Sequence, residues 1–443
     1  MLVAAAILSQ TALNLVRPLI SYKALALGGD AFAVGLISAA FAILPIVVAL
    51  WMGRQAAKVG RLKPLIMSGL TLVALSCWLL SLAGGLLPMA LASATLGLGH
   101  MAFTVAGQSA ITRLAGPARI DASFGWFTAS FSVGQLIGPL LAGWLLGQEM
   151  AAVGRIDDIN RALMLAGWIA LLAVPSVLIR FASQRPEDDP VAATGVKVKP
   201  DSVMTILSQP GVKSNMLSSL ALLATVDILV AFLPLMAEDH GIAPSIVGVL
   251  LALRAAASIL SRMLLTVLLR RWSRDQLVAA SLAGAAVGLA VLPFVFDIFW
   301  LAALSLIVGG FFLGLGQPVT MALMTQAVRA ESRSAALAIR ILGNRAGQVL
   351  LPATAGLLAA PLGASGAVWM ASLLLGALVA TASRNNRARR GLRGAAHHSS
   401  ESAKFLRHRG FDTPAHHRRG DPEDATGPVL PEQEDSERHA AEV

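Results

Sequence analysis

The chain has 443 residues, of which 56% are hydrophobic and only 14% are charged, and it carries a formal net charge of +10. Soluble domains average about 25% charged residues, so this composition excludes an ordinary soluble protein. The single cysteine, Cys77, excludes an internal disulfide and any cysteine-based metal site.

Apolar runs long enough to cross a bilayer, about 20 residues each, recur along the chain. The expected spans are Leu2–Ala26, Ala31–Met52, Pro64–Leu82, Leu86–Ile111, Ala122–Leu146, Ala162–Phe181, Val212–Met236, Pro244–Leu269, Gln276–Val295, Phe299–Ala327, Ala335–Leu358 and Ala364–Ala382. The first run lacks a basic leader and a cleavage site, so we interpret it as a span and not as a removed signal peptide. The predicted fold class is an all-α membrane protein with twelve transmembrane helices.

Polar segments divide these spans into two groups of six. We expect an N-terminal six-helix bundle over 1–182, a cytoplasmic linker over 183–211 and a C-terminal six-helix bundle over 212–383. The remainder, 384–443, is rich in Arg, His and Pro and contains too little apolar sequence to fold alone, which predicts a disordered cytoplasmic tail. Its histidines imply no fixed ligand geometry, and we expect neither a metal nor another cofactor.

Basic residues are distributed unevenly between the two sides of the predicted spans. The loops on one side carry 21 Lys and Arg, whereas those on the other carry only Lys23, Arg155 and Arg161. Basic loops stay in the cytoplasm, so the asymmetry predicts a multi-pass protein of the inner (plasma) membrane with both termini cytoplasmic. The positive charge therefore reflects membrane orientation, and no nucleic-acid partner is expected.

A ten-residue segment that begins at Gly134 recurs 213 residues later, beginning at Gly347. The matching positions are Gly134, Gln135, Pro139 and Gly143, which recur as Gly347, Gln348, Pro352 and Gly356. The same offset relates Val34-Gly35 to Val247-Gly248, and Leu96–Gly99 recurs as Leu313–Gly316 after four further residues. The chain is therefore one membrane unit written twice, and parallel repeats of this kind are a transporter architecture.

The repeated segment also has a mechanical interpretation. Gly134 and Gly138 lie four residues apart, which removes side chains from one helix face and allows a second helix to approach closely. Pro139 removes one backbone hydrogen bond and permits a bend. We therefore predict a packing motif in helices 5 and 11 at the contact between the halves, formed by Gly134, Gly138, Pro139, Gly143, Gly347, Pro352 and Gly356.

The loop expected after the second span contains Gly53, Lys58, Gly60 and Arg61. Together with the doubled six-span layout, it resembles the gating loop of the major facilitator superfamily over residues 1–383. Ala57 stands where that family usually has an Asp that helps to latch the cytoplasmic gate, so the resemblance does not extend to the usual latch. The glycine and proline pattern of the fifth span is similar to that of the twelve-helix drug:proton antiporter branch, whose members are mostly exporters.

Charged residues are costly inside hydrocarbon, so each one within a span is a candidate functional residue. Asp227 is the only acidic residue deep in a span, and it shares the membrane with Arg17, Arg254, Arg262, Arg340 and Arg345. At about 1.5 Å per residue, Asp227 and Arg254 each lie roughly 13–15 Å below the outer face, which predicts an ion pair. One interpretation is a purely structural neutral pair. In the other, Asp227 takes up a proton when Arg254 moves away, because a desolvated carboxylate without a cation favours its neutral form.

The remaining charged residues differ in predicted depth. Arg345 lies near mid-depth, whereas Arg17, Arg262 and Arg340 are close enough to an interface to extend toward it. In the superfamily, helices 1, 4, 7 and 10 line the central cavity, which implies a substrate or proton pathway. The residues so placed are Arg17, His100, Gln108, Asp227 and Gln317. Several arginines against one Asp favour an anionic substrate.

The sequence therefore predicts a secondary active transporter that moves a small organic solute by alternating access, with proton-coupled export. An uptake symporter or facilitator of a small anionic metabolite is the alternative on the same fold. A membrane-embedded enzyme would need clustered catalytic groups, and this chain scatters one Asp and one His. The expected partners are the solute, protons and membrane lipid, and we expect a monomer.

Overall fold

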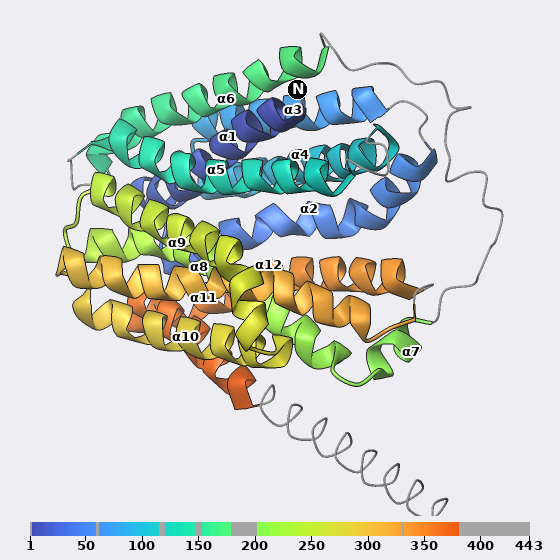
Figure 1. The fold of residues 1–443 in the computed structure, drawn as a ribbon. Helices are drawn as coiled ribbons and strands as arrows, with labels where there is room; N and C mark the ends of the chain where they lie inside the picture. Colours follow the sequence, from blue (N-terminus) through green and yellow to red (C-terminus); the bar gives the residue numbers. More distant parts are fainter. Residues whose placement is uncertain are drawn as a thin grey trace, which may run out of the picture. The chain divides into compact units, whose positions relative to one another are not determined.

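The computed structural model describes residues 2–58, 62–114, 120–147, 153–178, 202–329 and 332–380. Nearly all of these residues are helical, and no strand occurs among them (Figure 1). The N-terminal half comprises α1 (Leu2–Ala26), α2 (Ala31–Lys58), α3 (Leu62–Leu82), α4 (Leu86–Leu114), α5 (Ile120–Leu146), η1 (Val153–Arg155) and α6 (Ile156–Leu178). The C-terminal half comprises α7 (Val203–Ser208), α8 (Val212–Asp239), α9 (Pro244–Arg271), α10 (Arg274–Val295), α11 (Phe299–Gln326), α12 (Arg333–Leu362) and the helix Ala364–Ala380.

Ten of the described helices are long and apolar enough to cross a membrane, and Ala364–Ala380 is a shorter apolar helix. One further long helix, α12, completes the set of twelve spans. Its 30 residues include three arginines, which lower its mean hydropathy. The predicted all-α fold with six spans in each half is therefore confirmed. The end of the bundle at which α1 ends and α2 begins is called the predicted outer end below, and the opposite end the predicted inner end.

Some helices are longer than their apolar runs. The helix α2 continues to Lys58, so the segment from Gly53 to Lys58, predicted as a loop, forms its last turns. The helix α6 begins at Ile156, six residues before the predicted start, and has Asp157 and Asp158 in its first turn. Acidic residues at a helix N-terminus interact favourably with the helix dipole, so the helix extends beyond the hydrocarbon.

The short helix α7 lies in the segment predicted as a linker. Its Ile206 is buried against residues of α11, α12 and the connection between them. Ser202 caps this helix by accepting a hydrogen bond from the Thr205 backbone N–H. Packing of the C-terminal half therefore begins before α8.

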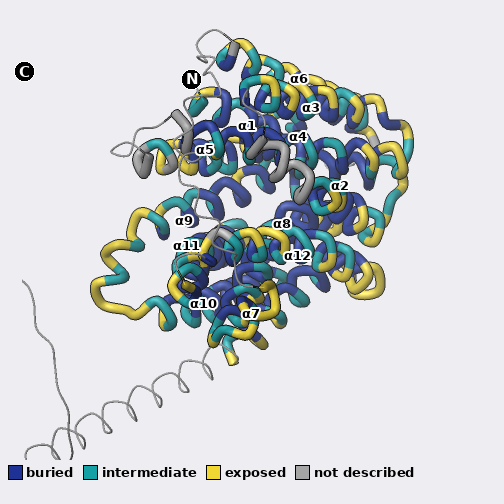
Figure 2. The backbone as a smooth tube through the Cα atoms, turned by 90° about the vertical axis from the view of Figure 1, so that its right-hand side faces the viewer, coloured by how far each residue is buried: buried dark blue, intermediate teal, exposed yellow. Residues whose placement is uncertain are grey.

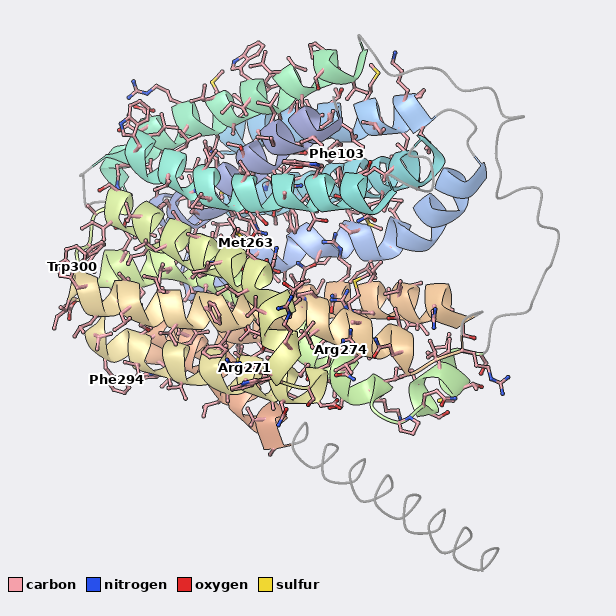
Figure 3. The ribbon with its side chains drawn as sticks, viewed as in Figure 1. Phe103, Met263, Arg271, Arg274, Phe294 and Trp300 are labelled. Carbon is pink, nitrogen blue, oxygen red and sulfur yellow. The ribbon has the colours of Figure 1, made fainter. Side chains whose placement is uncertain are left out.

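Large apolar side chains are exposed on the outward faces of the bundle, including Phe294 and Trp300, as Figure 3 shows. In water such a surface would be an association site, whereas in a bilayer it faces lipid. The most buried of the candidate spans is α8, with 83% of its apolar window inside the protein, and Figure 2 shows the buried residues gathered around it. The functional residues on α8 are therefore shielded from lipid.

The two halves meet at two pairs of glycines. A methyl group built on Gly35 of α2 would lie 2.5 Å from the Pro352 carbonyl oxygen and 2.8 Å from Gly356 Cα of α12. A methyl group on Gly143 of α5 would lie 3.1 Å from Gly248 Cα of α9. The repeat offset converts one pair into the other, because Gly35 corresponds to Gly248 and Gly143 to Gly356. Backbone-to-backbone contact between the halves is thus made twice, once on each side of the bundle.

Two cations counted as outer-loop residues in the sequence are buried. Lys23 is 1% exposed, and its Nζ donates to the carbonyl oxygens of Leu80 at 2.5 Å and Ser81 at 2.8 Å and to Asn160 Oδ1 at 2.7 Å. Since carbonyl groups in the last turn of a helix lack intrahelical partners, Lys23 caps the end of α3.

Arg155 is fully buried at the predicted outer end. It forms an ion pair with Glu238 of α8, and its guanidinium lies 5.0 Å from the centre of the Tyr22 ring. Because η1 belongs to the N-terminal half and α8 to the C-terminal half, this ion pair ties the halves together at that end.

The glycine contact between α5 and α9 predicts a large difference between two substitutions in one helix. Gly143→Ala places its methyl group 2.7 Å from the Pro244 carbonyl oxygen, whereas Gly125→Ala meets nothing within 4 Å. We expect Gly143→Ala to lower the free energy of unfolding by about 1–3 kcal/mol through overpacking, and Gly125→Ala to change it little. Thermal unfolding of the detergent-solubilised variants measures this, and equal effects would contradict the close approach of α5 and α9.

Candidate functional site

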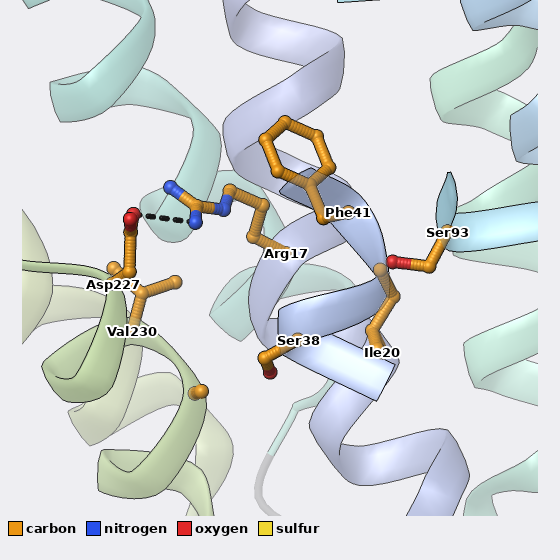
Figure 4. A pocket seen from close by; sticks show the side chains of 8 residues that line it. Arg17, Ile20, Ser38, Phe41, Ser93, Asp227 and Val230 are labelled. Carbon is orange, nitrogen blue, oxygen red and sulfur yellow. Dashed lines mark hydrogen bonds and ion pairs between the residues drawn. The ribbon is translucent and has the colours of Figure 1, made fainter. Parts of the chain in front are cut away.

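An ion pair between the halves lies at the centre of the candidate site. Arg17 Nη2 of α1 donates to Asp227 Oδ1 of α8 at 2.5 Å, as Figure 4 shows. The two side chains are 19% and 5% exposed. Neither residue is near a helix end, so the pair joins the two halves deep in the bundle.

The second oxygen of Asp227 binds the repeated segment of α12. Gln348 Nε2 donates to Asp227 Oδ2 at 2.7 Å, and Gln348 Oε1 accepts from Arg345 Nη1 at 3.0 Å. The arrangement is a chain of four side chains from three helices, Arg17–Asp227–Gln348–Arg345. Each carboxylate oxygen therefore accepts a hydrogen bond, one from a cation of the opposite half and one from an amide of its own half.

The predicted ion pair between Asp227 and Arg254 is wrong. No hydrogen bond or ion pair joins these two described residues, and the buried Arg254 Nε has no hydrogen-bond partner. Depth along the membrane normal was predicted as equal, but depth does not set the rotation of a helix about its axis. The helix α9 packs mainly on α5 and α11 and only slightly on α8, and Arg254 leans on Gly310 of α11.

Two further arginines, which the sequence predicts to lie within reach of an interface, donate hydrogen bonds to groups within the bundle. Arg340 is 9% exposed, and its Nη2 donates to Gln317 Oε1 of α11 at 2.8 Å. Arg262 Nη1 donates to Ser132 Oγ of α5 at 3.3 Å, and its Nε donates to the Gly314 carbonyl oxygen at 3.4 Å. The contact with Ser132 is another polar link between the halves.

His100 and Gln317 occupy equivalent positions in the two halves, since each directly follows a copy of the Leu-Gly-Leu-Gly repeat. Each binds the first long helix of its own half. His100 Nδ1 lies 3.3 Å from Gln10 Nε2 of α1, and Gln317 Nε2 donates to the Ser219 carbonyl oxygen of α8 at 2.8 Å. Gln108 is exposed and is not brought to the Arg17–Asp227 pair.

A small pocket adjoins the central ion pair. Its lining, drawn in Figure 4, is Arg17, Ile20, Ser38, Phe41, Ser93, Asp227, Val230 and Ala231. The Arg17 guanidinium lies 5.2 Å from the centre of the Phe41 ring, where the negative face of the ring attracts a cation. The charged pair therefore borders a space with both polar and apolar walls.

The predicted packing motif is divided between two kinds of contact. Gly134 packs on Gln10, and Gly138 packs on Asn14 and Leu15, all within the N-terminal half. Gly347 packs on Leu220 of its own half. Gly143 and Gly356 instead contact the opposite half, and Pro139 and Pro352 supply carbonyl oxygens at those contacts.

Parts of the predicted gating loop lie outside the described residues. Gly53 and Lys58 belong to the end of α2, whereas Gly60 and Arg61 are not described. Among the residues that the structure does describe, no group of His, Cys, Asp or Glu could hold a metal ion.

The role of Gln348 was not predicted, although the sequence holds a signal for it. Gln135 and Gln348 are equivalent in the repeat, and the same offset relates Asn14 to Asp227. The C-terminal half therefore has a carboxylate and an amide where the N-terminal half has two amides. A pair of polar residues that recurs in both halves, but carries a charge in only one of them, was therefore a signal for the Asp227–Gln348 contact.

Comparison with known proteins bears on the whole described chain. The sequence model of the Major Facilitator Superfamily matches residues 2–226 and 215–411. No curated protein sequence gives a significant match.

Three solved structures illustrate the similarity of the fold. The nucleoside transporter NupG superposes with a TM-score of 0.68 at 15% identity, covering 87% of this chain and 98% of that one. A bacterial homolog of the human lysosomal transporter Spinster, in an inward-facing and occupied conformation, gives 0.66 at 15% identity, with 86% and 96% covered. A D-xylose-proton symporter gives 0.66 at 14% identity, with 84% and 95% covered.

A double-mutant cycle tests the central ion pair. Either Arg17→Gln or Asp227→Asn leaves one buried charge without its partner, whereas the double variant removes both charges. We expect a coupling of about 0.5–3 kcal/mol in the free energy of unfolding, measured on detergent-solubilised protein. The control cycle combines Arg254→Gln with Asp227→Asn and should give a smaller coupling, and the reverse order would contradict the pairing.

Proposed function

The chain belongs to the major facilitator superfamily, and we propose that it is a proton-coupled exporter in which Asp227 accepts the coupling proton. Membership in this family makes it a secondary transporter of small solutes and not an enzyme. The proposal adds the energy source, the direction and the residue that couples the two fluxes.

One observation carries the proposal: the only carboxylate among the described residues that lies far from a helix end binds a cation of the opposite half. Alternating access requires contacts between the halves to break and re-form. When the halves move apart at their centre, Asp227 loses Arg17 while Gln348, which belongs to its own half, stays with it. The Asp227–Arg17 bond is therefore the part of the polar chain that conformational change can break.

The same bond supplies a means of coupling. A buried carboxylate that has lost its cation favours the protonated form, and a protonated carboxyl group no longer attracts an arginine. Proton binding and the contact between the halves then exclude one another, so a proton shifts the balance between the two access states. This is a population shift produced by differential binding of one ligand to two conformations.

The charges around the centre favour an anionic solute. Arg17, Arg254, Arg262, Arg340 and Arg345 all lie within the bundle, against Asp227 alone among the described deep acids. A solute that brings a negative charge offsets part of the cost of burying these cations. A cationic drug would need an additional acidic residue near the centre. An anionic drug or metabolite therefore fits the charges of this site better.

An uptake symporter or facilitator of a small anionic metabolite is the second candidate. It is favoured by the similarity of the fold to that of a D-xylose-proton symporter, a protein that moves a proton and a solute in the same direction. Export is favoured by the glycine and proline pattern of α5 alone. On the basis of its basic loops we place the protein in the inner membrane with both termini in the cytoplasm. We further propose that it acts as a monomer.

Asp227→Asn tests the proton site directly. The substrate is first identified by growth of a deletion strain on organic acids, sugars and drugs, and its flux is then measured in liposomes. We expect the variant to lose accumulation driven by a pH gradient, by at least tenfold, and to keep substrate counterflow, because the carboxamide cannot bind a proton. Accumulation in an acidic lumen indicates antiport, and accumulation in an alkaline lumen indicates symport.

The control is Asp158→Asn, which removes a carboxylate from an exposed pair with Arg161 on the surface of α6. It should leave pH-driven flux unchanged. Normal pH-driven flux in Asp227→Asn would show that the proton is carried elsewhere.

The Arg155–Glu238 ion pair yields a second test. Opening the predicted outer end must break this pair, so Glu238→Gln should favour the open state. We expect faster modification by a membrane-impermeant thiol reagent of a cysteine introduced by Ser38→Cys in a Cys77→Ala background. Asp158→Asn at the same end should not accelerate labelling, and unchanged labelling in Glu238→Gln would mean that the pair does not hold this end closed.

A further inference from the structure

Arg254 is a buried cation that forms no ion pair with any acidic residue in the described part of the chain. Its side chain is in the middle of α9, the residue is 3% exposed, and no hydrogen bond links it to a described residue. The Nε atom is shielded from solvent and has no partner. Burying a guanidinium without a partner is costly, so a residue of this kind points to a ligand that completes it.

The surroundings place Arg254 beside the central site. The charges that act on it are those of Arg262, Arg17 and Asp227. The two oxygens of Asp227 accept from Arg17 and from Gln348, and no hydrogen bond or ion pair joins Asp227 to Arg254. Arg254 therefore lies within electrostatic range of the central ion pair and forms no bond with a described acidic residue.

The backbone of α11 holds the stem of Arg254 in place. A methyl group built on Gly310 would lie 2.8 Å from Arg254 Cγ and 2.9 Å from its Cα, so the absence of a side chain at Gly310 makes room for this arginine. A guanidinium positioned by such packing loses little further freedom when it binds a ligand. The site is pre-organised on two helices of the C-terminal half.

We propose that Arg254 binds the carboxylate of the transported solute, at a site separate from the proton-accepting Asp227. The inference rests on the proposed function and deepens it by naming the substrate class. A planar carboxylate matches the two parallel N–H groups of a guanidinium. A phosphate dianion would gain less, because Asp227 keeps a negative charge nearby and the helix N-termini that favour phosphate lie at the ends of the bundle.

The two acidic groups then have different positions and different roles. Asp227 stays with Gln348 and exchanges Arg17 for a proton, whereas the carboxylate of the solute takes the free cation on α9. Binding of the solute and binding of the proton affect each other electrostatically, because the charges of Arg17 and Asp227 act on Arg254.

Binding to the purified full-length chain in detergent tests this without a gradient. The probes are benzoate and succinate, with benzamide as the neutral analogue of benzoate and inorganic phosphate as the other anion. Since a ligand that binds only the folded state raises the unfolding temperature, the melting temperature is recorded against probe concentration. We expect a carboxylate to raise it and benzamide to leave it unchanged.

Arg254→Gln should weaken the apparent affinity for that carboxylate at least tenfold. The matched control is Arg270→Gln, an exposed arginine in the last turn of the same helix, which should retain wild-type affinity. Arg254→Lys keeps the charge but not the paired N–H groups, so it should bind several-fold more weakly than wild type. It serves as the decisive variant if Arg254→Gln does not fold.

Four results would overturn the proposal: no response to either carboxylate, an equal response to benzamide, a phosphate response of the same size, or unchanged affinity in the Arg254 variants. If wild type shows no pH-driven flux but binds carboxylates through Arg254, proton coupling fails and the anion site stands. If pH-driven flux depends on Asp227 while substitution of Arg254 leaves carboxylate binding unchanged, proton coupling stands and the anion site fails.

Discussion

A lone carboxylate buried among arginines is the constraint around which this structure is arranged. Asp227 is 5% exposed on the most buried candidate span, and its two oxygens are divided between a cation from the other half and an amide from its own half. A charge at this depth is tolerated only with partners, so both neighbours are needed whenever Asp227 is ionised. Because Arg17 belongs to the opposite half, the pairing of Asp227 depends on how the two halves pack against each other.

The contact surfaces between the halves are suited to such movement. At Gly35–Gly356 and Gly143–Gly248 the helices meet through backbone, without side chains that interlock. The repeat makes these two contacts equivalent, so a rocking movement of one half against the other would change both contacts in the same way. The Arg155–Glu238 ion pair joins the halves at the predicted outer end, and the Arg17–Asp227 pair joins them at the centre. The two halves are therefore joined by two ion pairs and by two backbone contacts at glycines.

The C-terminal half carries most of the unusual chemistry. The same offset places Asn14 opposite Asp227 and Ser132 opposite Arg345. The N-terminal half thus has neutral residues at two positions where the C-terminal half has charges, and it contributes Arg17, the counter-ion of Asp227. The C-terminal half therefore supplies most of the charged groups, and the N-terminal half supplies the cation that pairs with Asp227. Any ligand that competes for these charges is linked reciprocally to the access state.

The linear sequence was enough to predict the spans and their duplication, and to name the charged residues within them. These properties are local: an apolar run of sufficient length forms a membrane helix wherever it lies, and charge counts in the loops orient it. The single deep acid and its five candidate cations could likewise be named from their positions along each run. The helix boundaries at Lys58 and Ile156 differed, because capping and dipole interactions extend helices beyond their apolar runs.

The partners of those charges were decided only by the tertiary structure. Asp227 binds Arg17 and not Arg254, Lys23 caps α3, and Arg155 is buried beneath α8. Residue spacing gives a position along one helix axis, whereas a contact also requires the rotation of that helix and the identity of its neighbours. Both follow from the packing of all the helices at once. Here that packing places α9 against α5 and α11, and Arg254 pairs with no acidic residue that the structure describes.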